Sequence, residues 1–235
     1  PLEIACTCGS NEWLAETAVL DTWATSSVTP QINSRWGEEN DRSDKIMPMG
    51  LRTQAHEIIR TWAFYTIVKS IYHTGDIPWK DIMVCGFVLA KKGEKISKSK
   101  KNDASSPSAL ISKYSADAVR YWTANSRLGT DMMFSEDELN GSKRFLTKIW
   151  NASKFTLMHL EDYKKEKPKK ILPQDQWIIE RYGEALKECK RHLDNYEVGL
   201  ARLIIDEFFW KDYCDNYLEL VKDRVYKPQV YGDAN

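Results

Sequence analysis

The sequence lacks long hydrophobic runs and has no excess of charge of either sign. No stretch of about 18 apolar residues occurs, so no membrane-spanning helix is expected, and the first residues lack the basic-then-apolar order of a signal peptide. Lys plus Arg and Asp plus Glu both number 34, so any site for an anionic partner must come from local clustering. These absences lead us to expect a cytoplasmic protein without a membrane partner.

Cysteine is scarce and scattered, which excludes a small disulfide-stapled fold. The odd number and wide spacing of the cysteines favour a reducing compartment. A Cys-x-Cys pair such as Cys6 and Cys8 cannot close a tetrahedral metal site alone, and we expect no zinc or other protein-held metal. The five positions are Cys6, Cys8, Cys85, Cys189 and Cys214.

Apolar and aromatic residues are present in amounts that can fill a core. The 235 residues are 42% hydrophobic and include nine Trp, which suits one large domain or two small ones. The chain begins at Pro1 without Met, and its last residues carry no obvious signal for the end of a domain. We therefore expect an internal piece of a longer protein.

The first half of the chain carries an α/β pattern. Residues 1–45 are irregular and are expected to be a connecting segment. Lys45–Leu51 is predicted to be a short strand and Gln54–Tyr72 a helix, with Thr53 as its N-cap. Ile82–Leu89 is a continuous apolar run of strand length, which suggests burial on both faces. Strand, helix and strand in this order predict a parallel crossover unit.

The second half is predicted to be almost entirely helical. Gly129–Phe134 is loop-like, and from Ser142 onward the apolar residues recur at helical spacing. Three long amphipathic helices with short links predict an antiparallel bundle, so the chain divides near residue 142 into an α/β part and an all-α part. The expected helices cover about 107–114, 117–125, 142–160, 173–193 and 197–226.

Residues 91–101 form a lysine-rich loop. Six Lys against one Glu give a local charge of 6 − 1 = +5 in a chain of zero net charge. A solvated surface loop is one interpretation. The other is a phosphate site, because the loop follows a buried strand, Gly93 permits a tight turn, and Ser97 and Ser99 add hydroxyl donors. An ammonium about 4 Å from a phosphate charge is worth about 4 kcal/mol at an effective dielectric of 20.

The loop also carries a family signature. Lys95-Ile96-Ser97-Lys98-Ser99 resembles the Lys-Met-Ser-Lys-Ser motif of class I aminoacyl-tRNA synthetases. Its surroundings are similar, in order and spacing, to the valyl-tRNA synthetase branch of that family, over nearly the whole chain. The segments that carry this likeness are Val19–Trp23, Gln54–Trp62, Lys113–Arg120 and Trp150–Ser153.

The resemblance implies a fold and a domain order. It implies the C-terminal half of a Rossmann-type parallel sheet followed by an all-α antiparallel helix bundle. Residues 1–45 would connect into the catalytic domain, and 46–103 would form the C-terminal half of that domain with the lysine loop. Residues 104–142 would be a stem-contact region, and 143–235 an incomplete anticodon-binding domain.

The resemblance also implies roles around ATP. Lys95 and Lys98 would act in catalysis by holding the ATP phosphates, which enter with Mg²⁺, and by stabilising charge on the departing pyrophosphate. Ser97 and Ser99 lie in the same ATP-binding loop. Glu57 matches the position that binds the ATP ribose.

Further positions would surround the adenine and the amino acid. His56 could touch the nucleotide, and a helix-surface or packing role for it stays open. The backbone of Gly86, Phe87 and Val88 would sit against adenine. A valine pocket would be walled by Trp23, Ile58 and Trp62, and such a pocket selects its substrate by shape and apolar contact.

Three departures from the family pattern bear on activity. Ile96 replaces Met, which nearly conserves volume, and Lys101 stands where the family usually has Gly. The His-Ile-Gly-His motif and the editing domain are absent, so residues 1–235 alone are expected to be inactive. The implied parent is a monomeric valine–tRNA ligase with ATP, valine and tRNA(Val) as partners. The alternatives are a noncatalytic tRNA- or protein-binding module, or isoleucyl or leucyl specificity.

Two further features invite an RNA-binding interpretation. The aromatic residues between Phe208 and Tyr217 recur at helical spacing, which favours packing within the core over base stacking. The basic run Lys164–Lys170 is interpreted as a solvated linker, with contact to the tRNA backbone left open.

Overall fold

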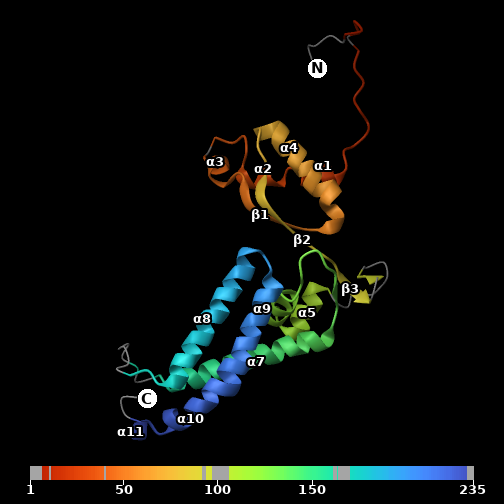
Figure 1. The fold of residues 1–235 in the computed structure, drawn as a ribbon. Helices are drawn as coiled ribbons and strands as arrows, with labels where there is room; N and C mark the ends of the chain where they lie inside the picture. Colours follow the sequence, from red (N-terminus) through yellow and green to blue (C-terminus); the bar gives the residue numbers. More distant parts are fainter. Residues whose placement is uncertain are drawn as a thin grey trace. The chain divides into compact units, whose positions relative to one another are not determined.

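A computed structural model of the chain describes residues 7–10, 12–39, 41–91, 94–96, 106–160, 163 and 170–231, with only the backbone of Lys91 and Lys95. The chain divides into two compact units, Pro1–Ile82 and Met83–Asn235 (Figure 1). The described residues are mostly helical, with small sheets. None of the helices among them combines the length and apolar character that crossing a membrane requires.

The first unit contains short helices around one longer helix and a two-stranded sheet. The expectation of an irregular segment over 1–45 is wrong in part, because three short helices form there. Asp21 begins the first of them by accepting a hydrogen bond from the Ala24 amide at 3.1 Å. The elements are α1 (Thr22–Ser26), α2 (Thr29–Ser34), α3 (Arg42–Ile46), β1 (Met49–Ala55), η1 (His56–Ile58), η2 (Ile59–Ala63), α4 (Phe64–Thr74) and β2 (Trp79–Cys85), whose last residues belong to the second unit.

The change from strand to helix lies later than the sequence predicts. Lys45 belongs to α3 and Thr53 to β1, so the predicted strand limits and the Thr53 N-cap are wrong. The chain turns helical at His56 through a 3₁₀ turn and then a π-helical segment. Small side chains are buried along this helical stretch, namely Ala63, Thr66 and Ser70. They allow close packing, and the Thr66 hydroxyl donates to the Trp62 carbonyl at 2.6 Å.

The predicted strand Ile82–Leu89 is two strands. β2 ends at Cys85 and β3 (Val88–Lys91) begins after a break at Gly86 and Phe87. Burial on both faces is also wrong, since Ile82 is 39% and Val88 36% exposed, although Leu89 is buried. β3 pairs antiparallel with β4 (Glu94–Lys95) and parallel with β5 (Met132–Met133), in the order β4-β3-β5.

The helices of the second unit confirm most of the predicted helical pattern. The third long helix is continuous but includes the π-helical segment η5. The first long helix begins at Glu136 rather than near Ser142, because Ser135 caps it and three acidic residues occupy its first turn. The elements are α5 (Pro107–Tyr114), α6 (Ala116–Thr123), α7 (Glu136–Met158), α8 (Pro173–Asp194), α9 (Val198–Glu207), η5 (Phe208–Tyr217), α10 (Leu218–Tyr226) and α11 (Pro228–Tyr231).

The core of the second unit lies where α5, α6 and α7 meet. Its buried members are Leu110, Tyr114, Ala118, Trp122 and Leu139. Met132 of β5 packs against this cluster, and β5 pairs with β3. β3, the strand that leads into the lysine loop, is therefore connected to the helical core through its pairing with β5.

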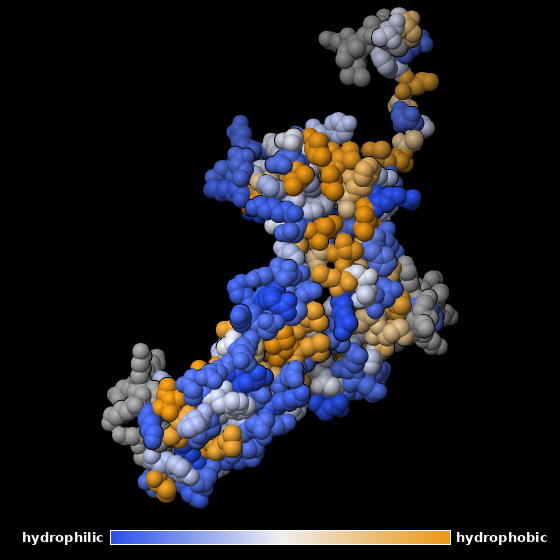
Figure 2. Space-filling model, viewed as in Figure 1, coloured by the Kyte–Doolittle hydropathy of each residue, from blue (hydrophilic) through white to orange (hydrophobic). Residues whose placement is uncertain are grey.

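The aromatic residues of η5 pack among the helices. Phe145 of α7 contacts Phe209 edge-on, with ring centroids 5.4 Å apart, and the hydroxyls of Tyr213 and Thr156 are 2.6 Å apart. Trp210 is 37% exposed, so the packing is incomplete. Phe209 and Tyr213 are half-buried, so they pack among the helices as predicted but do not belong to the fully buried core. Figure 2 shows further hydrophobic patches on the visible face of the molecule.

A largely buried ion pair joins the start of α8 to α10. The Arg224 guanidinium donates to both carboxylate oxygens of Asp175, at 2.7 and 2.6 Å, and the Tyr217 hydroxyl donates to the same group at 2.9 Å. Burial opposes ionisation of Asp175, but these hydrogen bonds outweigh it and hold the pKa of Asp175 below its usual range. Burial, followed by the hydrogen bond to Asp175, raises the pKa of Tyr217 to about 12.

Replacing Asp175 by Asn should destabilise the helical region at neutral pH. We expect a loss of about 2–3 kcal/mol in the free energy of unfolding, because Arg224 stays buried without its anion. Since the folded-state pKa of Asp175 is lowered, its contribution is complete above the unfolded pKa and is lost as the pH falls through the folded pKa. Urea unfolding at pH 7 and at about pH 3, below the unfolded-state Asp pKa of about 3.9, measures both effects.

Asp194→Asn is the matched control. Asp194 pairs with Lys190 at 2.6 Å, but both side chains are more than half exposed. Such a pair contributes about 0.5 kcal/mol or less. A loss in Asp175→Asn no larger than in Asp194→Asn would contradict a stabilising role for the buried pair.

Candidate functional site

Trp62 is held from two sides within the first unit. Its indole N–H donates to the Ser26 carbonyl at the end of α1 at 2.8 Å. The guanidinium carbon of Arg52 lies 3.1 Å from the centroid of the Trp62 ring. Because α1 also carries Trp23, this hydrogen bond links the elements that bear two of the predicted pocket residues.

The other predicted residues of this unit lie one turn earlier. Ile58 ends η1 and is half-buried, as are Trp23 and Trp62. His56 and Glu57 are exposed on the same 3₁₀ turn. A ligand could thus reach the imidazole and the carboxylate from solvent. The assignments of His56 and Glu57 to nucleotide and ribose stay predictions.

Gly86 and Phe87 form a tight junction in the second unit. The Phe87 amide donates to the Asp131 carboxylate at 2.8 Å, and its carbonyl accepts from the Met132 amide at 2.7 Å. A Cβ added to Gly86 would lie 2.1 Å from the Thr130 carbonyl oxygen. These Phe87 backbone groups therefore already have partners within the fold, and the adenine role of Gly86, Phe87 and Val88 stays a prediction.

Only the start of the lysine loop is described. The backbone of Lys95 lies in β4 opposite Leu89, and Ile96 is half-buried. Ser97, Lys98, Ser99 and Lys101 lie outside the described residues, as do Cys6 and nearly all of the basic run Lys164–Lys170. The predicted phosphate contacts of Lys95 and Lys98 therefore stay predictions.

A cluster of hydrogen-bonded polar side chains between α6 and α9 was not expected from the sequence. Arg202 donates to Asp206 and to the Asn125 side chain, both at 3.0 Å, and the Tyr121 hydroxyl donates to Asp206. Burial raises the pKa of the Asp206 carboxyl despite these two donors. Arg202 and Asp206 are four residues apart, a helical spacing, but Tyr121 and Asn125 lie about 80 residues earlier in the chain, so the sequence pattern did not indicate that the two pairs meet.

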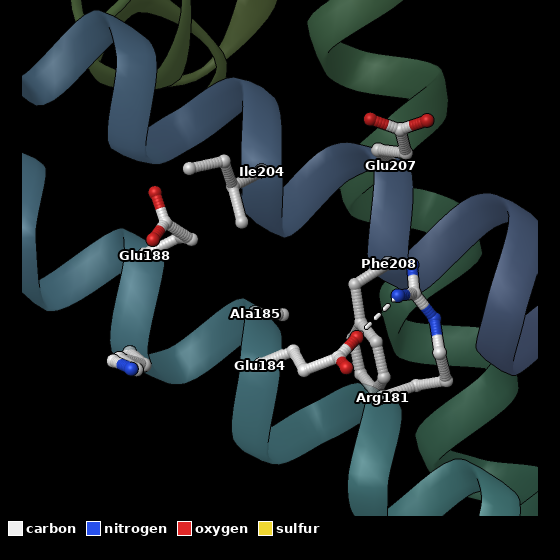
Figure 3. A pocket seen from close by; sticks show the side chains of 8 residues that line it. Arg181, Glu184, Ala185, Glu188, Ile204, Glu207 and Phe208 are labelled. Atoms are coloured by element: carbon white, nitrogen blue, oxygen red, sulfur yellow. Dashed lines mark hydrogen bonds and ion pairs between the residues drawn. The ribbon is translucent and has the colours of Figure 1, made fainter.

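Two grooves of the second unit lie along α8. One groove of about 390 Å³ contains more acidic than basic groups, and Arg181 is engaged there by Glu184 at 2.5 Å (Figure 3). A second groove of about 380 Å³ is lined entirely by apolar and aromatic side chains, including Tyr182 and Phe208.

Comparison with known proteins decides the family. The family model described as "tRNA synthetases class I (I, L, M and V)" matches residues 3–135. The chain belongs to the class I tRNA synthetases. A second model, "Anticodon-binding domain of tRNA ligase", matches residues 175–233 of this synthetase chain. The resemblance carried by the lysine-loop motif is thereby confirmed.

Individual relatives share this assignment. A valine–tRNA ligase of Wolbachia sp. subsp. Brugia malayi (strain TRS) is 47% identical over 223 residues, covering 92% of this chain. One of Rickettsia felis is 46% identical over 222 residues, covering 88% of this chain. The chain spans 26% of the length of either relative.

Solved synthetase structures have a similar fold. A Mycobacterium tuberculosis methionyl-tRNA synthetase in complex with methionyl-adenylate has a TM-score of 0.71 at 20% identity, over 85% of this chain and 40% of that one. A LeuRS of Agrobacterium radiobacter K84, in a ternary complex with tRNA and LeuAMS, has a TM-score of 0.70 at 18% identity, over 96% and 31%. At these identities the likeness supports the synthetase fold, and specificity needs other evidence.

Proposed function

We propose that the protein containing this chain is a valine–tRNA ligase acting in protein biosynthesis. It would form valyl-adenylate from valine and ATP and then transfer valine to tRNA(Val). The observation that carries this proposal is the 47% identity to a relative named valine–tRNA ligase, over 92% of the chain. We further propose a monomeric, cytoplasmic enzyme.

The proposal also assigns a role in the synthetase fold to each part of the chain. The elements around β2 and β3 would be the C-terminal half of a Rossmann-type sheet, and residues 104–142 the stem-contact region. Helices α7 to α10 would form an antiparallel bundle, supported by the packing of α8 against α9 and by the match to an anticodon-binding model. Binding of tRNA would therefore involve the helical part of the chain.

The chemistry of adenylate formation assigns the chain's residues to separate tasks. The valine carboxylate is already ionised at neutral pH, so its attack on the α-phosphorus needs no side-chain base. Lys95 and Lys98 would neutralise the charge that develops on pyrophosphate. Glu57 would accept hydrogen bonds from the ribose, and Trp23, Ile58 and Trp62 would exclude larger side chains by shape.

Magnesium would enter with ATP rather than in a protein-built cage. In the part of the chain that the structure describes, no group of three or more His, Cys, Asp or Glu side chains could hold a metal ion. Mg²⁺ commonly keeps substrate phosphates among its ligands. When bound, it would add positive charge at the phosphates beside the two lysines.

Amino-acid-dependent pyrophosphate exchange by the purified parent protein tests the proposal. We expect valine to give the highest kcat/KM among valine, isoleucine, leucine and methionine. A higher kcat/KM for isoleucine or leucine would assign the protein to another branch of the family, and no exchange with any of the four would favour a noncatalytic binding module. Residues 1–235 alone should show no valine-dependent exchange.

A further inference from the structure

Arg52 is buried between two tryptophan rings of the first unit. It lies on β1 and is 9% exposed. Its guanidinium carbon lies 3.1 Å from the Trp62 ring centroid and 4.8 Å from the Trp79 ring centroid. Two of its nitrogens, Nε and Nη2, are buried and have no hydrogen-bond partner within the described residues. Both rings thus lie within cation–π distance of this guanidinium.

Burying a guanidinium costs free energy that packing alone does not offset. An unpaired cation inside a protein loses its hydration, and burial accordingly lowers the pKa of Arg52 to about 10. Arginine stacks flat on an aromatic face, where the ring quadrupole attracts its charge. The arrangement therefore couples the orientation of the Trp62 ring to the side chain of Arg52.

Trp62 has a second constraint at its edge. The hydrogen bond from its indole N–H to the Ser26 carbonyl fixes the rim of the ring at 2.8 Å. Arg52 lies over the face of the same ring. With one contact at the rim and one on the face, the ring has little freedom to tilt.

We infer that Arg52 is a positioning residue that sets the shape of the amino-acid pocket by holding Trp62. This inference rests on the proposed function, in which Trp62 is a wall of the valine pocket. A pocket that distinguishes aliphatic side chains by shape depends on where its walls stand. Arg52 touches neither substrate nor ATP in this scheme and acts on amino-acid recognition only through the position of Trp62.

The test uses Arg52→Met and Arg52→Lys in the parent protein, with pyrophosphate exchange as the readout. For Arg52→Met we expect the KM for valine to rise about tenfold and the preference for valine over isoleucine to fall about tenfold, with the KM for ATP unchanged. Arg52→Lys keeps the charge but loses the planar stack, so it should be intermediate. Lys80→Met removes an exposed cation on the neighbouring strand and should match the wild type.

Each outcome decides the inference. A fall in kcat with an unchanged valine KM and an unchanged preference would show a purely structural role and overturn it. If Arg52→Met does not fold, as judged by circular dichroism, the valine KM of Arg52→Lys and its preference for valine over isoleucine test the inference instead. Failure of the wild type to use valine would instead refute the proposed function, so the two failures are distinguishable.

Discussion

Replacing Lys98 by Ala in the parent enzyme should lower the kcat of valine-dependent pyrophosphate exchange by about 10²–10³-fold, the usual effect of removing one preorganised charge-stabilising donor. The reason is that Lys98 would meet negative charge that increases as pyrophosphate departs. The KM for valine should change little, because the pocket residues lie on other elements of the chain. Steady-state exchange at varied ATP and valine concentrations separates these quantities.

Lys101→Gly is the matched control for this loop. It removes a charge three residues away and introduces the residue that the family usually carries there. We expect a change in kcat of less than about fivefold, which corresponds to a weak charge interaction of about 1 kcal/mol or less. Equal losses in Lys98→Ala and Lys101→Gly would mean that only the total charge of the loop matters. A Lys98→Ala enzyme with wild-type kcat would remove Lys98 from the mechanism.

Substituting Gly86 by Ala should disrupt the junction between β2 and β3. The added Cβ would lie 2.1 Å from the Thr130 carbonyl oxygen and 2.6 Å from the Asp131 amide nitrogen, and both are backbone atoms. Because backbone cannot rotate away as a side chain can, we expect a loss of about 3 kcal/mol or more in local stability. Hydrogen exchange of the Met132 and Phe134 amides, which donate to Phe87 and Leu89, reports this loss directly.

Gly50→Ala provides the comparison. Gly50 lies in β1, and a Cβ added there would meet no atom within 4 Å. The substitution should therefore leave stability within about 0.5–1 kcal/mol of the wild type. Unchanged exchange of the Met132 and Phe134 amides in Gly86→Ala would show that the 127–131 turn moves aside without loss.

The helical half was the most predictable part of the fold. Local signals located α5, α6 and α8 within a few residues, with periodic apolar residues as the signal for α8, because a helix is specified by contacts between neighbours in sequence. The start of α7 was missed, although Ser135 and the acidic turn after it are local capping signals. The strand limits were less predictable. The break between β2 and β3 depends on hydrogen bonds between Phe87 and the segment around Asp131, which is distant in the sequence.

Some residues of the candidate site could be predicted from the sequence and others could not. Lys95, Glu57 and Trp62 could be selected from motif order, because a family motif is a property of the sequence itself. Arg52 could not, since nothing in its neighbourhood along the chain indicates burial between two tryptophan rings. Exposure and hydrogen bonding of such a residue depend on elements that meet only after folding.

The sequence by itself determined the synthetase family, the helices of the second half and the lysine-rich loop, because each is encoded in residues close together along the chain. Only the tertiary structure decided that Arg52 stacks on Trp62, that Gly86 lies against Thr130, and that Asp175 binds Arg224. Each of these contacts joins separate elements of the chain. Their energies come from burial and close approach, which exist only once those elements have packed.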